Sequence, residues 1–264
     1  MKPFFVLYVK ELKAHKILFF FFFLLIVGMN AYGLIQLEYF LHILYIIKSF
    51  GDIDPQVFQS NNFSYFWGPM SMLAAFILIF SLPFLLAHAF NTEWKSETHY
   101  QMFALPVPQY IVNLAKVAVV ASKGIVGVGV GLVIGSLYLW IGRKVGFLDS
   151  TMELMSVPRV ALVIGLIFVT SIVFILGVVT GMEGVKFAVK RYRGLTAITF
   201  FLIAVFLYGQ LLPQGIKFFE FSGQISMPTP ANFTIGLAPF VYTILMGIIF
   251  MIIGLVVYEK RAEI

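Results

Sequence analysis

The sequence contains no cysteine and few charges, and each absence excludes a class of protein. Without cysteine there are no disulfides, no thiolate metal sites and no cysteine nucleophile. Charged residues make up 11% of the 264 residues, against about 25% in soluble domains. Hydrophobic residues make up 61%, and the mean hydropathy is +0.97, which excludes a soluble domain and a disordered chain. The chain belongs in a lipid bilayer.

The motifs of several common enzyme sites are missing as well. No glycine is followed by lysine, so the G-x-x-x-x-G-K-[ST] phosphate-binding loop is absent. The four histidines, His15, His42, His88 and His99, lie in unrelated segments and match no metal-binding pattern. We therefore expect no catalytic residues, no metal site and no cofactor in this chain.

Charge-poor apolar runs predict six transmembrane helices. A helix needs about 20 apolar residues to cross a bilayer. Runs of this kind occupy residues 17–37, 65–90, 117–142, 160–182, 194–214 and 235–258. The sequence thus predicts an all-α integral membrane protein in which residues 1–264 form a single transmembrane domain.

The distribution of basic residues predicts the orientation of these spans. If the N-terminus is cytoplasmic, thirteen of the eighteen Lys and Arg residues fall on the cytoplasmic side, as the positive-inside rule requires. We therefore predict a multi-pass protein of the cell membrane with both termini in the cytoplasm. Since topology accounts for the net charge of +6, no nucleic acid partner is expected.

Residues 1–16 have the pattern of a basic amphipathic helix. Lys10, Lys13 and Lys16 alternate with apolar side chains such as Phe5 and Leu12. Such a helix lies on the inner leaflet in contact with membrane lipids. A signal peptide fits less well, because the apolar run over 17–37 is longer than a usual signal-peptide core.

Two further features concern the interior of the spans. Gly127, Gly131 and Gly135 share one face of the third predicted span, and this spacing favours close helix packing. Gly177 and Gly181 in the fourth span have the same spacing and the same expected role. His88 and Lys123 are ionisable groups near span ends, where they can extend to the interface. The alternative for these two residues is a place on an ion or proton pathway.

The segment after the second span, residues 91–105, predicts an interfacial amphipathic helix that ends at Pro106. Phe90, Trp94, Thr98 and Met102 share one face, while Glu93 and Glu97 lie on the other. Two carboxylates four residues apart repel each other slightly, so a cationic partner surface would explain them. A solvated acidic face explains the pattern equally well.

At this segment the sequence resembles the permeases of type-2 ABC exporters. Glu93, Glu97-Thr98, Ala104-Leu105-Pro106-Val107 and Lys116 follow the family's order of motifs, although the usual glycine before Thr98 is absent. Lys10-Glu11-Leu12 and Tyr258-Glu259-Lys260-Arg261 resemble the family's ends. The resemblance therefore covers the layout of the whole chain.

The resemblance implies a fold and a set of site residues. Residues 1–16 would be an elbow helix, 91–105 a coupling helix that docks on a separate ATPase subunit, and 211–234 a re-entrant connector at the outer gate. The implied coupling residues are Glu93, Trp94, Lys95, Glu97, Thr98, Leu105 and Pro106, and the implied gate residues are Pro213, Pro228 and Pro230.

The implied function is that of the membrane permease subunit of an ATP-driven exporter. Two permeases, as a homodimer or with a related permease, would assemble with cytoplasmic ABC ATPase subunits that bind ATP and Mg. The rival interpretation is a secondary transporter or channel that ATP does not drive. That class predicts inward-facing charges within the membrane and internal repeats, neither of which the sequence displays convincingly.

Overall fold

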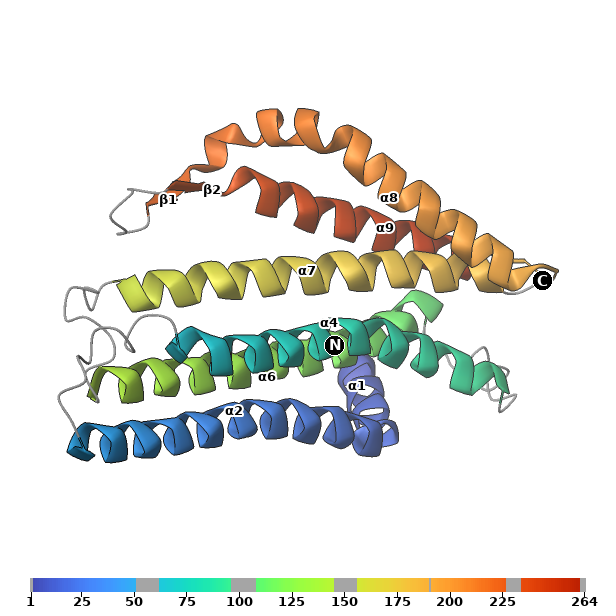
Figure 1. Cartoon of the computed structure of the whole chain (residues 1–264). Coiled ribbons are helices and arrows are strands. Elements are labelled where there is room, and N and C mark those ends of the chain that lie inside the picture. The colour runs from blue at the N-terminus through green and yellow to red at the C-terminus, as the bar shows by residue number, and fades with distance from the viewer. Residues whose placement is uncertain are drawn as a thin grey trace.

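The computed structural model describes residues 2–50, 62–95, 108–144, 156–189, 191–226 and 234–261. Its elements, in chain order, are α1 (Lys2–Ala14), α2 (Lys16–Phe50), α4 (Asn62–Lys95), α6 (Gln109–Lys144), α7 (Ser156–Phe187), α8 (Arg193–Phe218), the 3-10 helix η1 (Glu220–Ser222), β1 (Gln224–Ser226), β2 (Thr234–Gly236) and α9 (Ala238–Arg261). Figure 1 shows the long helices stacked side by side.

Six of the described helices are long and apolar enough to cross a membrane, in agreement with the predicted number of spans. They are α2, α4, α6, α7, α8 and α9. Helices suit such apolar sequences because a bilayer offers no water to satisfy backbone N–H and C=O groups. The prediction of an all-α, multi-pass membrane protein agrees with this architecture.

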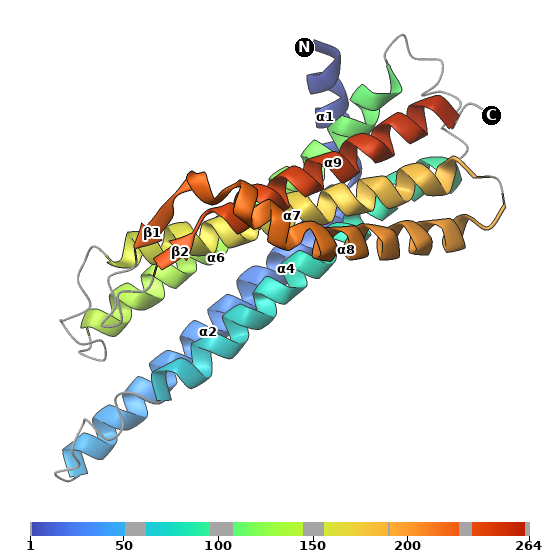
Figure 2. The ribbon, with the colours of Figure 1, turned by 90° about the horizontal axis from the view of Figure 1, so that it is seen from above.

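The first four of these helices are longer than a bilayer requires. They contain 32 to 36 residues, which corresponds to about 48 to 54 Å at about 1.5 Å per residue. The hydrocarbon core measures only about 30 Å. Figure 2 shows the α2–α4 pair running together at an angle to the layer formed by α6, α7 and α9.

Two apolar clusters hold the bundle together. The larger joins α2, α4, α6 and α7 through residues such as Ile26, Leu82, Val120 and Ile172. The smaller joins α7, α8 and α9 around Phe250. Many apolar side chains on the outer faces remain exposed, as expected for helices that face lipid.

The most extensive helix contact is between α7 and α9, which touch at glycines. A Cβ atom added to Gly177 would run into the backbone of Gly247, and one added to Gly184 would run into the backbone of Gly254. Gly177 and Gly184 are seven residues apart in α7, as are Gly247 and Gly254 in α9, so the same contact is repeated after about two helical turns. Glycine therefore sets the spacing of these two helices.

The connection from α8 to α9 contains a short β-hairpin. β1 and β2 pair antiparallel, with Ile225 opposite Ile235. Within the predicted connector over 211–234, α8 continues to Phe218 and contains Pro213, and η1 and β1 follow. Figure 1 shows α8 bending toward this end. Pro228 and Pro230 lie outside the described residues.

Candidate functional site

The ends of α4, α7 and α9 and the starts of α2, α6 and α8 meet at one end of the bundle, beside α1 (Figure 1). We call this the basic end, because many of the described lysines and arginines lie in these helix ends, in α1 or in the link from α7 to α8. They are Lys10, Lys13, Lys16, Lys116, Lys186, Arg191, Arg193 and Lys260. The basic residues that the sequence assigns to one side of the membrane therefore gather together.

Helix α1 docks on the beginning of α6 through one apolar and one polar contact. Leu7 packs against Val112 and Ala115, and all three side chains are buried. About two turns beyond Ala115 on α6, the Tyr8 hydroxyl donates a hydrogen bond to Oγ of Ser122 over 2.9 Å. The predicted amphipathic helix thus has its inward face on the protein, while Lys10, Lys13 and Lys16 remain exposed.

The Glu11 carboxylate is buried in the same interface and is surrounded by cations. Nε2 of His15 lies 3.6 Å from Oε2 of Glu11. Burial alone raises the pKa of Glu11, but the contact with His15 and the positive charges of Lys116, His15 and Lys10 outweigh it, so the pKa is below its ordinary value of 4.5. Lys123, also on α6, interacts electrostatically with the same carboxylate. Glu11 therefore stays ionised although it is buried.

The lowered pKa of Glu11 predicts that the docking of α1 on α6 weakens at acid pH. A group whose pKa is lowered by folding stabilises the fold fully above its ordinary pKa and loses that effect as the pH falls through the lowered value. Spin labels on Val9→Cys and Leu114→Cys, both exposed positions on α1 and α6, should give a narrow distance distribution at pH 7 that broadens below about pH 4.5.

The control for this experiment is Glu11→Gln in the same labelled chain. The amide keeps the size of the side chain but cannot titrate, so the distribution should no longer change between pH 7 and acid pH. An unchanged acid transition in Glu11→Gln would mean that another group controls the docking of α1.

Lys116 connects α6 to an aromatic cluster at the basic end. Its side chain is 1% exposed, and its ammonium lies 5.0 Å from the centre of the Phe90 ring on α4. The Phe90 ring in turn contacts Tyr258 of α9, which also contacts Phe187 of α7. Cations are attracted to aromatic faces, more strongly when water is excluded. One buried cluster therefore joins four helices.

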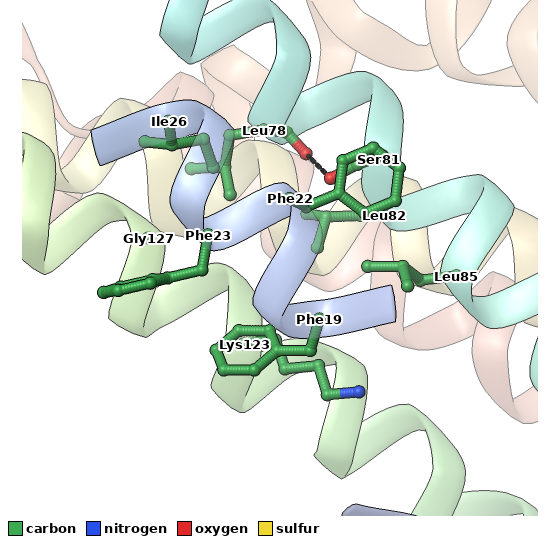
Figure 3. A pocket seen from close by; sticks show the side chains of 10 residues that line it. All are labelled: Phe19, Phe22, Phe23, Ile26, Leu78, Ser81, Leu82, Leu85, Lys123 and Gly127. Atoms are coloured by element: carbon green, nitrogen blue, oxygen red, sulfur yellow. Dashed lines mark hydrogen bonds between the residues drawn. The ribbon is translucent and has the colours of Figure 1, made fainter. Parts of the chain in front are cut away.

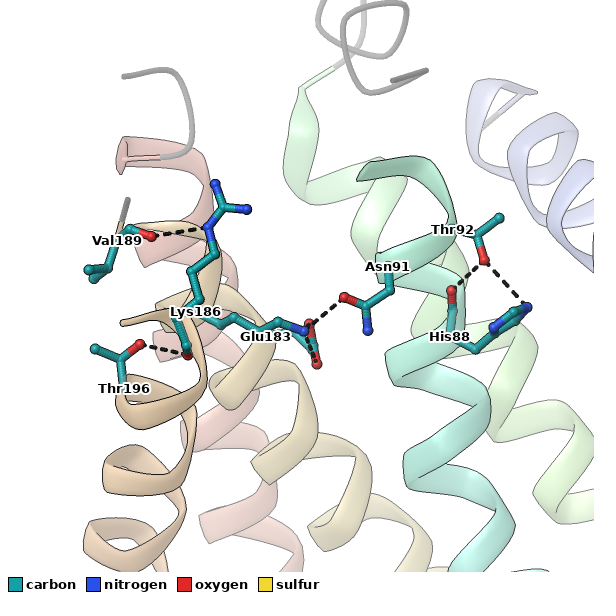
Figure 4. A network of polar contacts seen from close by, with 8 residues as sticks. His88, Asn91, Thr92, Glu183, Lys186, Val189 and Thr196 are labelled. Atoms are coloured by element: carbon teal, nitrogen blue, oxygen red, sulfur yellow. Dashed lines mark hydrogen bonds and ion pairs between the residues drawn. The ribbon is translucent and has the colours of Figure 1, made fainter. Parts of the chain in front are cut away.

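A polar network joins the ends of α4 and α7 (Figure 4). Nζ of Lys186 donates to Oδ1 of Asn91 over 2.8 Å and to both carboxylate oxygens of Glu183, over 2.8 and 3.1 Å. Glu183 is buried and Lys186 is partly buried. Hydrogen bonds between ionised groups are stronger than neutral ones. The ion pair itself lies within α7, and a charge-assisted hydrogen bond from Lys186 to Asn91, as well as apolar packing, fixes the last turn of α4 to α7.

Lys123 was expected to reach the interface, yet it is 4% exposed. It lines a cavity of about 10 Å³ among α2, α4 and α6, together with Phe19, Phe22 and Leu82 (Figure 3). Its ammonium lies 5.3 Å from the centre of the Phe19 ring. The ring and the Glu11 charge offset part of the desolvation cost of burying this ammonium group.

Asn113 lies one turn before Lys116 on α6, is 1% exposed, and neither its amide nitrogen nor its oxygen has a hydrogen-bond partner in the described part of the chain. A buried polar group left without a hydrogen bond costs about 1 to 3 kcal/mol. The start of α6 is therefore not optimised for stability at this position.

The structure places part of the predicted coupling segment. Glu93, Trp94 and Lys95 form the end of α4, which is one continuous helix from Asn62. Glu93 follows Asn91 by two residues. Glu97, Thr98, Leu105 and Pro106 lie outside the described residues.

Of the glycines predicted to pack, Gly127 faces Leu78 of α4, and a Cβ atom at Gly131 would meet open space. Gly135 is also in α6.

The buried carboxylates of Glu11 and Glu183, and the contact of Lys186 with Asn91, were not predicted from the sequence. The available signal was local, since Glu183 and Lys186 are three residues apart and Glu11 and His15 are four apart, so each pair shares a helix face. The described residues contain no group of three or more His, Asp or Glu side chains able to hold a metal ion.

Comparison with protein-family models, with curated proteins and with solved structures gives no match for this chain.

Proposed function

We propose that the chain is the membrane permease subunit of an ATP-driven ABC exporter. In this proposal two permeases, identical or related, enclose the translocation path, and separate ATPase subunits bind ATP and Mg. The segment after α4 acts as the coupling helix, α1 as the elbow helix, and the connector from α8 to α9 lines the outer gate.

The observation that carries the proposal is how the end of α4 is attached. Asn91 is tied to α7 by Lys186, and Phe90 contacts Lys116 of α6. Glu93 to Lys95 follow within the same helix. A force applied by a partner to the coupling segment would therefore reach both α6 and α7. Rigid contacts of this kind are what a permease without its own phosphate-binding loop needs to respond to ATP.

The surface of α8 is compatible with a second permease copy. Its buried residues are Ala197 and Ala204, whereas large apolar side chains such as Phe201, Leu202 and Phe206 are exposed. Lipid or another apolar helix face can cover such a surface. The proposal assigns part of it to the partner permease.

Glu97 is the coupling residue with the clearest test. Glu97→Lys should weaken assembly with the ATPase subunit about thirtyfold or more, because removing one partner of a buried charge pair costs about 2 to 5 kcal/mol. The measurement is co-purification and ATPase turnover of the chain co-expressed with a P-loop protein encoded beside its gene. The chain alone should hydrolyse no ATP.

Glu263→Lys near the C-terminus is the matched control for Glu97→Lys and should leave assembly and turnover unchanged. If both variants assemble and stimulate turnover like the unmodified chain, the acidic face is merely solvated and the coupling role is wrong. ATP hydrolysis by the highly purified chain alone would contradict the proposal itself.

A secondary transporter or channel remains the second candidate, because Lys123 is a buried cation among three membrane-spanning helices. That function requires solute movement in vesicles containing only this chain and its loss in Lys123→Met. The exporter proposal expects no movement in such vesicles.

A further inference from the structure

A groove opens on the outside of the bundle where α1 turns into α2 and faces α4. Its volume is about 670 Å³, and it is lined by Ala14, His15, Ile17, Leu18, Phe21, Phe22, Phe84, Leu85 and His88. The adjacent small cavity that holds Lys123 shares Phe22 and Leu85 with the groove. The groove is thus separate from the cavity, and Lys123 lines the cavity but not the groove.

The groove is polar at one end and apolar along the rest. The rings of His15 and His88 lie 5.5 Å apart at the level of α1, and Thr92 contacts Nε2 of His88 over 3.3 Å. Phe84, one turn deeper in α4, and Phe21, deeper in α2, line the apolar part. A ligand that fits must therefore have a polar head at the height of α1 and an apolar tail along the helices.

The charges around the polar end favour an anionic head. Lys13 and Lys16 are exposed on either side of Ala14 and His15. The one acidic residue of α1, Glu11, is buried against His15 and close to Lys116. The described side chains from Lys10 to Lys16 thus present only positive charge to an approaching ligand.

We propose that this groove binds one anionic phospholipid of the leaflet next to α1. The phosphate lies at the His15–His88 end beside Lys16, and one acyl chain lies against Phe21 and Phe84. The groove opens sideways between two membrane-spanning helices, where phospholipids are the abundant molecules with this combination of head and tail. The volume is within the range of sites that bind small amphiphilic ligands. This inference does not depend on the proposed transport function.

The test uses the absence of native cysteine to place one fluorophore in the groove. Phe84→Cys carries a bimane label in the full chain, reconstituted in phosphatidylcholine nanodiscs. Acyl-chain-brominated phosphatidylglycerol or brominated phosphatidylcholine is titrated in, and quenching is recorded. Phe80→Cys is the matched control, because Phe80 and Phe84 are 62% and 70% exposed on the same helix, but only Phe84 lines the groove.

Brominated phosphatidylglycerol should half-quench the label at position 84 at about a fivefold lower mole fraction than brominated phosphatidylcholine. Fivefold corresponds to about 1 kcal/mol, the attraction typical of one lysine near anionic lipid. At position 80 the two lipids should quench equally. Lys16→Gln combined with His88→Gln should remove the preference at position 84.

Three results would overturn the lipid site. They are equal quenching by both lipids at position 84, a preference that survives Lys16→Gln with His88→Gln, and no quenching by either lipid, which would mean that protein covers the groove. If Phe84→Cys fails to fold, Phe21→Cys labels the same groove from α2, and the same criteria apply.

Discussion

Gly177→Ala is expected to lower the free energy of unfolding by about 1 to 3 kcal/mol, the usual cost of forcing extra atoms into a packed interior. The added methyl group would overlap the backbone of Gly247, so the two helices must move apart rather than adjust a side chain. Gly247→Ala and Gly254→Ala should act in the same direction, because their Cβ atoms would meet the backbone of α7. Thermal unfolding of the purified chain in detergent measures the effect.

Gly131→Ala is the control and should have the opposite sign. Nothing lies within 4 Å of a Cβ atom at this position. Alanine is better than glycine in a helix by about 0.5 to 1 kcal/mol, so this variant should be slightly more stable than the unmodified chain. Equal stability of Gly177→Ala and Gly131→Ala would mean that α7 and α9 do not meet at their backbones.

Lys186→Met is expected to be the most damaging change at the basic end. It leaves the buried Glu183 carboxylate without its cation and removes the donor to Asn91. Breaking a buried ion pair from one side typically costs about 3 to 5 kcal/mol, whereas replacing both partners by apolar residues is often nearly neutral. The double variant Glu183→Leu with Lys186→Met should therefore recover most of the lost stability in the same unfolding assay.

Lys260→Met provides the matched control, since Lys260 is an exposed lysine near the end of α9. It should change stability by less than about 0.5 kcal/mol. If the double variant is as unstable as Lys186→Met alone, the loss comes from the changed shape of the side chains, and the ion pair is not its cause.

The number of spans could be predicted because it depends on local composition, whereas the full length of the helices that contain them could not. The first predicted span ends at residue 37, just before Glu38, but the helix that contains it, α2, continues to Phe50. A charged residue indicates where a helix leaves the lipid. The helix can continue beyond that point, because it keeps its backbone hydrogen bonds in water. In the same way, α6 begins at Gln109, before the third predicted span starts at residue 117. Lys116 lies in this additional part of the helix and is buried against Phe90.

The sequence did not predict which helices meet at their glycines. Regular spacing pointed to Gly177 and Gly181 in α7 as well as to α6, yet Gly131 in α6 has open space beside it. The closest approach joins Gly177 and Gly184 to Gly247 and Gly254. Spacing within one helix shows which residues share a face, but the partner of that face depends on how the whole chain is arranged. The polar set around Lys186 was missed for the same reason, because Asn91 and Lys186 are far apart in the sequence.

The glycine contact between α7 and α9 also constrains the order of synthesis. Because α8 lies between the two helices in the chain, the ribosome must complete a whole additional span before the partner of α7 exists. Until then the glycine-bearing face of α7, at Gly177 and Gly184, is open to lipid, while α4 and α6 can already pack against α7. Of the described helices, α9 is therefore the last to join the nascent bundle. A chain interrupted before residue 238 lacks the helix that packs on the glycines of α7.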